Sequence, residues 1–137
     1  EVANEKLKDG WHVWLFGSEK DTAATIKIQT MTQNHCLNLA GKTSLTESID
    51  LMSLTKAVVT NDSGLMHIAA ALGKHTIAIY GSSDPKNTPP LNDKANTLYL
   101  DLSCSPCFKR ECPLEHLNCL NDLKPEMVVD ALSKIKD

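Results

Sequence analysis

The sequence predicts an α/β protein with a Rossmann-like parallel sheet that carries helices on both faces. Short apolar, β-branched runs alternate with longer amphipathic runs along most of the chain. Most of the apolar runs end in a turn rich in glycine or hydroxyl residues, which is typical of strands that lead into a crossover helix. The 137 residues are 42% apolar, enough for one domain with a hydrophobic core.

The expected elements alternate along the chain. A helical pattern over residues 2–9 ends at Gly10, and a last helix opens at residues 123–126, with Pro125 in its first turn. Strands are expected at residues 11–16, 36–39, 57–60 and 76–80, and a shorter one at 97–100. The intervening helices are expected at 19–33, 44–55 and 65–72.

Two of these helices have identifiable caps and apolar positions. Ser18 is expected to cap the helix at 19–33, and Ser44 with Glu47 forms a capping box for the helix at 44–55. The apolar positions expected to face the core are Ala23, Ala24, Ile26, Ile28 and Met31 in the first helix and Leu45, Ile49, Leu51, Met52 and Leu54 in the second.

The stretch from residue 57 to Gly73 is the most informative part of the chain. A buried strand is followed by a polar turn, Asn61 to Gly64, in which glycine is free to take unusual backbone angles. An alanine-rich helix then runs to Gly73, a natural helix stop. Asp62 or Ser63 can cap this helix, and the amides of Ser63 and Gly64 can face an anion.

Four small-residue turns follow expected strands, at residues 17–18, 41–43, 61–64 and 81–83. Because the carboxyl ends of parallel strands meet at one edge of a sheet, these turns are expected to converge on a nucleotide or phosphate pocket. Each turn alone also fits an ordinary connection between a strand and a helix.

Composition argues against several function classes. Aromatic residues make up 4% of the chain and the net charge is −3, so no base-stacking platform or basic surface for nucleic acid is expected. No run is long enough for a transmembrane helix, and no signal peptide is present. A nicotinamide-dependent oxidoreductase would need a G-x-G-x-x-G turn, which the sequence lacks. A receiver-type or other ligand-sensing domain would need an acidic cluster, and Asp62 is nearly alone.

The run from Val59 to Leu72, VTNDSGLMHIAAAL, resembles the signature of glycosyltransferase family 9, the bacterial ADP-heptose:lipopolysaccharide heptosyltransferases. The similarity continues through IYGSSDP at 79–85 and TPP at 88–90, and it extends back to LFGS at 15–18 and LAGKT at 39–43. The TPP segment is nearer to the second heptosyltransferase than to the first. The resemblance implies the C-terminal half of a GT-B fold, with residues 1–137 as a donor-binding domain that lacks its first strand and residues 102–120 as a Cys-rich loop within it.

The resemblance also implies roles for individual residues. Asp62 would bind hydroxyls of the donor heptose, and the amides of Ser63 and Gly64 would hold the diphosphate. His67 would face the donor one helical turn later, and Thr43 would flank the adenosine. Taken singly, each residue has an ordinary structural explanation: a helix cap for Asp62, a surface histidine for His67, close helix packing for Gly64 and a loop position for Thr43.

The same family pattern implies parts that are absent here. The catalytic base and the residues that bind the lipopolysaccharide inner-core acceptor belong to an N-terminal lobe. No catalytic residue is therefore expected within residues 1–137. The chain begins at Glu1 inside a helical pattern rather than with a strand, which indicates a fragment of a longer protein or a mature chain trimmed at its N-terminus. We expect the fragment alone to be inactive, and the full-length enzyme to be cytoplasmic, peripheral to the inner membrane and independent of any cofactor. The alternative is a non-enzymatic nucleotide- or ligand-binding α/β domain.

Four cysteines form a second feature, at positions 104, 107, 112 and 119, with His116 between the last two. Such thiols can hold a structural zinc ion, but the spacing is irregular and lacks a second C-x-x-C pair. Reduced thiols in a loop are the expected state and no metal site is assigned, while pairs oxidised after purification remain an alternative. Cys36 falls in an expected strand and is interpreted as a core thiol.

Overall fold

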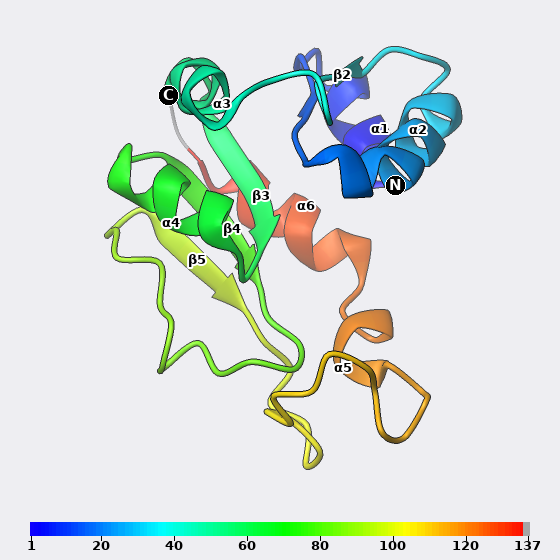
Figure 1. Cartoon of the computed structure of the whole chain (residues 1–137), viewed down its shortest axis with the longest axis vertical. Coiled ribbons are helices and arrows are strands. Elements are labelled where there is room, and N and C mark those ends of the chain that lie inside the picture. Colours follow the sequence, from blue (N-terminus) through cyan, green and yellow to red (C-terminus); the bar gives the residue numbers. More distant parts are fainter. Residues whose placement is uncertain (136–137) are drawn as a thin grey trace. The chain divides into compact units, whose positions relative to one another are not determined.

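The computed structural model describes residues 1–135 and divides the chain into two compact units, Glu1–Leu51 and Met52–Asp137. Figure 1 labels most of the helices and strands of both. The predicted α/β class is confirmed: parallel strands alternate with helices in both units. No helix within the described residues is long and apolar enough to cross a membrane.

The first unit contains a two-stranded parallel sheet. Strand β1 (Trp14–Leu15) pairs with β2 (Leu37–Asn38), and Trp14 lies opposite Leu37. The turns that follow the two strands are also joined, because the amide of Gly41 donates a hydrogen bond to the carbonyl of Gly17 at 3.0 Å. The helical elements that begin in this unit are α1 (Val2–Lys8), the 3-10 turn η1 (Glu19–Asp21), α2 (Thr22–Met31) and α3 (Leu45–Ser53), which ends in the second unit.

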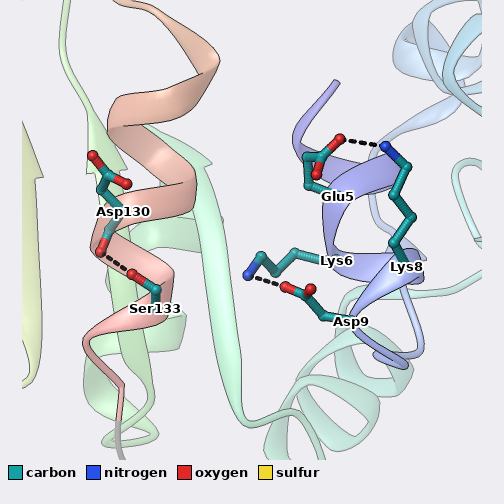
Figure 2. Close-up of polar contacts among 6 residues, drawn as sticks. All are labelled: Glu5, Lys6, Lys8, Asp9, Asp130 and Ser133. Atoms are coloured by element: carbon teal, nitrogen blue, oxygen red, sulfur yellow. Dashed lines mark hydrogen bonds and ion pairs between the residues drawn. The ribbon is translucent and has the colours of Figure 1, made fainter.

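Helix α1 carries two ion pairs, which Figure 2 shows. Lys6 Nζ lies 2.7 Å from Asp9 Oδ2, and Lys8 Nζ lies 2.7 Å from Glu5 Oε1. Lys6 is buried, and its ammonium group also lies 5.7 Å from the centre of the Trp11 ring. Its aliphatic stem is therefore covered while its charge keeps both an anionic and an aromatic partner.

The second unit contains the sheet that positions the candidate site. Its strand order is β3 (Ala57–Asn61), β4 (His75–Ile79) and β5 (Ala95–Leu98), and all neighbours are parallel. Its helices are α4 (Gly64–Ala71), α5 (Asn118–Asn121) and α6 (Pro125–Ser133). In Figure 1, α4 lies over β3 and β4. Gly73 ends this helical segment at φ +67, as the sequence predicted.

Central strand β4 is covered on both faces. Ala78 and Tyr80 form a buried cluster with Met66 of α4, and the neighbouring Ile77 is also buried. Because successive strand side chains point to opposite faces, Ile77 faces away from that cluster. Helix α6 contacts β4 and β5 and buries Val128, which supplies the second layer.

The Ser44–Glu47 capping box is confirmed, whereas the packing of the first-unit helices differs from the prediction. The backbone amide and hydroxyl of Ser44 both donate to Glu47 Oε2, and the amide of Glu47 donates to Ser44 Oγ. In α2 the expected apolar face is exposed, with Ile26 at 51% and Met31 at 56%, while Thr25 is buried. The predicted core face was wrong because the apolar positions of α2 do not form one stripe. Polar residues such as Gln29 and Asn38 pack between α2 and β2 instead.

Three further expectations need correction. Leu45 and Leu54 of the second helix are exposed, and only Met52 of its expected face is almost fully buried. Ser18 caps η1 rather than a continuous helix from residue 19, because Asp21 Oδ2 accepts hydrogen bonds from the Ser18 amide and hydroxyl. The Cys-rich loop contains a short helix, α5, that no apolar period indicates.

Candidate functional site

The candidate site begins where β3 ends and α4 begins. Asp62 and Ser63 are half-buried there, while Gly64 and His67 are exposed. Ser63 is the N-cap residue, with extended backbone angles (φ −157, ψ 170), but its side chain makes no capping hydrogen bond. Asp62 does not cap the helix either, because its carboxylate is engaged elsewhere. The helix therefore begins without a side-chain cap. The amide of Met66 donates to the carbonyl of Ser63 at 3.1 Å, and the amides that precede it are left for solvent or a ligand.

Gly64 opens the helix onto free space. A Cβ atom built on this residue would meet no atom within 4 Å, so close helix packing does not require glycine here. Gly64 also does not adopt the left-handed angles that the turn was expected to use; the glycines with positive φ are Gly10, Gly41 and Gly73. Glycine at position 64 is consequently required neither by close packing nor by a positive φ angle. The lack of a side chain leaves the helix end accessible.

Asp62 is held by a segment that lies 26 residues later in the sequence. The hydroxyl of Thr88 donates a hydrogen bond to Asp62 Oδ2 at 3.1 Å. The hydroxyl of Tyr80, which is fully buried, donates to the backbone carbonyl of Thr88 at 2.5 Å. The hydrogen bond from Tyr80 thus holds Thr88 in place, and the hydrogen bond from Thr88 holds the carboxylate of Asp62 in place.

The electrostatics of Tyr80 reflect this arrangement. Burial raises the pKa of its hydroxyl above the ordinary value of 10.0, and the negative charge of Asp62 raises it further. Hydrogen bonding to Thr88 acts in the opposite direction but does not cancel these effects. Tyr80 therefore stays protonated near neutral pH and serves as a hydrogen-bond donor beside an anionic carboxylate.

His67 lies on the same face of α4 as the helix start, since it is four residues after Ser63 and three after Gly64. Its side chain is exposed. Thr43 belongs to the first unit, where its hydroxyl lies 2.8 Å from Ser48 Oγ. The structure therefore brings Asp62, Ser63, Gly64 and His67 together, and the place of Thr43 beside them stays a prediction.

The sequence-based reasoning missed the supporting roles of Tyr80 and Thr88. Both fall within segments that carry the family resemblance, IYGSSDP and TPP, but neither spacing nor periodicity connects them to Asp62. Their irregular connection folds back over the start of α4, and only the folded chain shows that contact.

The loop of residues 102–120 carries four of the chain's five cysteines. Among the described residues, no group of three or more His, Cys, Asp or Glu side chains is arranged to hold a metal ion. The five cysteines are free thiols, and Cys36 is buried, as the core interpretation predicted.

Comparison with known proteins identifies the family. The model of glycosyltransferase family 9 (heptosyltransferase) matches residues 1–118. The chain belongs to glycosyltransferase family 9. It is 40% identical to lipopolysaccharide heptosyltransferase 2 of Escherichia coli K12 over 98% of this chain and 40% of that protein. It is likewise 40% identical to lipooligosaccharide heptosyltransferase 2 of Haemophilus influenzae, over 98% of this chain and 40% of the relative.

Solved structures agree with the fold. The structure of E. coli ADP-heptose LPS heptosyltransferase II superimposes with a TM-score of 0.81 at 39% identity, over 96% of this chain and 38% of that one. A family 9 glycosyltransferase from Veillonella parvula superimposes with a TM-score of 0.82 at 24% identity, over the same shares of the two chains, which supports the fold alone. This family 9 chain thus spans about 40% of the length of the curated relatives it matches.

Proposed function

We propose that this chain is the C-terminal, donor-binding lobe of a heptosyltransferase that transfers heptose from ADP-heptose to the inner core of lipopolysaccharide. The observation that carries the proposal is the uncapped, accessible start of α4 beside the carboxylate of Asp62, at the carboxyl end of a parallel strand. Ligands bind at this position in open parallel sheets. Membership of family 9 and the heptosyltransferase names of the relatives support the choice of substrate class.

In this proposal the diphosphate binds at the amides of Ser63 and Gly64, where the positive end of the helix dipole favours an anion. Asp62 accepts hydrogen bonds from sugar hydroxyls, since an ionised carboxylate offers only acceptors. His67 contacts the donor from the next turn of α4, and Thr43 flanks the adenosine.

The chemistry assigned to this chain is stabilisation of the leaving group. When the bond from the sugar to ADP breaks, negative charge develops on the diphosphate. Fixed amides aimed at that charge lower the barrier without having to reorient during the reaction. Deprotonation of the acceptor hydroxyl is assigned to an N-terminal lobe, together with acceptor binding at the cytoplasmic side of the inner membrane.

Calorimetric titration of the chain with ADP and with ADP-heptose tests these assignments. Asp62→Asn should weaken ADP-heptose binding by about tenfold, equivalent to one lost charge-assisted hydrogen bond, and should leave ADP binding nearly unchanged. Asp93→Asn is the matched control, because Asp93 is exposed in the same unit and no site role is assigned to it. Equal losses for both ligands would contradict the sugar-binding role of Asp62.

Two further comparisons separate this proposal from a non-enzymatic ligand-binding domain. A thermal-shift panel of ADP, ADP-heptose, UDP-sugars and NAD should favour the ADP-containing sugar; stabilisation by NAD but not by ADP-sugars would overturn the assignment. Residues 1–137 alone should not transfer heptose to a lipid A-core acceptor, because the deprotonating group is assigned to the other lobe. Transfer by this chain alone would refute that division of labour.

A further inference from the structure

The cysteine-containing loop of residues 102–120 is attached to the end of strand β4. The amide of Phe108 donates a hydrogen bond to the carbonyl of Ser82 at 2.7 Å, and the hydroxyl of Ser105 donates to the carbonyl of Gly81. A Cβ atom built on Gly81 would lie 2.8 Å from Leu120 Cδ2 and 3.3 Å from Cys119 Sγ. The loop therefore packs directly on the turn at Gly81, and its position is defined by the sheet.

The four cysteines of this loop line one pocket, here called the thiol pocket. Its lining includes Cys104, Cys107, Cys112 and Cys119, with the charged or titratable side chains Lys109, Arg110 and His116. Burial raises the pKa of Cys119, and the negative charges of Cys107, Cys112 and Cys104 raise it further, in that order. All four cysteines thus belong to one pocket.

Cys112 differs from the other thiols of the pocket. The nearby backbone amide of Leu117 and, to a smaller extent, those of residues 114–116 lower the pKa of the Cys112 thiol, although its partial burial acts in the opposite direction. Glu115 and Leu117 in the segment that follows Cys112 have left-handed backbone angles (φ 59 and 52). Cys112 is also half-exposed, so its thiolate is accessible.

These thiols are neither paired nor arranged around a metal. All four are free, and the described residues contain no group of side chains that could enclose an ion. Four free thiols that line one pocket together with Lys109 and Arg110, one of them the half-exposed Cys112, are instead the arrangement of an oxidation-sensitive site, in which a second cysteine resolves the first product.

We propose that the thiol pocket is a redox modification site, in which Cys112 reacts with hydroperoxides and then forms an intramolecular disulfide with another cysteine of the pocket. In the first step the Cys112 thiolate attacks one oxygen of hydrogen peroxide. The S–O bond forms, the O–O bond breaks, and hydroxide leaves and takes a proton from solvent. In the second step a neighbouring thiol attacks the sulfenic sulfur; the S–S bond forms, the S–O bond breaks, and water leaves with the proton of that thiol. The two cysteines supply the two electrons that reduce the peroxide.

Treatment of the freshly purified, reduced chain with one equivalent of hydrogen peroxide tests the proposal. The number of titratable thiols should fall from five to three, and peptide mapping should find a disulfide from Cys112 to Cys104, Cys107 or Cys119. Cys112→Ser should slow thiol loss at least about tenfold, because it removes the stabilised thiolate. Cys36→Ala is the control: it removes a thiol outside the pocket and should leave the rate for the remaining thiols unchanged.

A second measurement does not depend on a variant that folds. With less than one equivalent of iodoacetamide at pH 7, more than half of the label on the wild-type chain should be on Cys112. Uniform labelling, thiol loss at the wild-type rate in Cys112→Ser, or disulfides formed only between chains would overturn the proposal. One equivalent of zinc retained per chain after purification, with all four pocket thiols protected from labelling, would overturn it as well.

Discussion

The contact that holds the candidate site together is the hydrogen bond from the Tyr80 hydroxyl to the carbonyl of Thr88, and Tyr80→Phe tests it. This substitution removes one oxygen from a fully buried side chain and leaves the aromatic packing against Met66 in place. The Tyr80 hydroxyl oxygen lies 2.5 Å from the Thr88 carbonyl oxygen and 3.2 Å from Met66 Sδ, so the substitution removes the short hydrogen bond to Thr88 and the contact with the sulfur. The expected cost is about 1–2 kcal/mol, which is typical for removing one partner of a hydrogen bond.

The same cluster provides a matched control in Tyr99. Its ring packs against the buried cluster, but its hydroxyl is buried and has no hydrogen-bond partner among the described residues. Tyr99→Phe should therefore stabilise the chain by about 1 kcal/mol, because it removes a desolvated and unpaired polar group.

Thermal unfolding followed by circular dichroism distinguishes the two variants. For a cooperative unit of the length of the second unit, Met52–Asp137, a change of 1 kcal/mol in the free energy of unfolding shifts Tm by about 4–8 °C. Tm should therefore fall for Tyr80→Phe and rise for Tyr99→Phe. Equal destabilisation by both variants would show that loss of the hydroxyl acts through packing and not through hydrogen bonding. An unchanged Tm for Tyr80→Phe would show that this contact does not hold the Thr88 segment in place.

Two further predictions concern glycine positions and alkaline pH. Gly73→Ala should lower the free energy of urea unfolding by about 1 kcal/mol, because residue 73 has φ +67. Gly64→Ala should leave that free energy almost unchanged, because a Cβ atom at residue 64 meets no atom within 4 Å. Equal losses of stability for the two variants would refute the distinction. The raised pKa of Tyr80 means that its contribution to stability is complete below pH 10.0 and is lost as the pH rises through the higher folded-state value. Urea unfolding above pH 10 should therefore show a steeper loss of stability with pH for the wild-type chain than for Tyr80→Phe, and parallel curves would contradict it.

The sequence alone determined the order of the elements, except for the short helix α5, and the local features of the site. Apolar strand runs, the Ser44–Glu47 capping box and the Gly73 stop depend on residues within a few positions of one another, so pattern and backbone propensity were sufficient. For the same reason the turn at 61–64 could be recognised, because Asp62, Ser63 and Gly64 are adjacent in the chain.

Only the tertiary structure decided what surrounds that turn. The carboxylate of Asp62 accepts a hydrogen bond from Thr88 instead of capping its own helix, and the buried hydroxyl of Tyr80 holds Thr88 in place. The exposed apolar face of α2 and the lowered pKa of Cys112 were equally unpredictable from the sequence pattern. Each of these features depends on contacts with residues distant in the sequence or on an irregular backbone conformation. The spacing of residues along the chain does not predict such contacts.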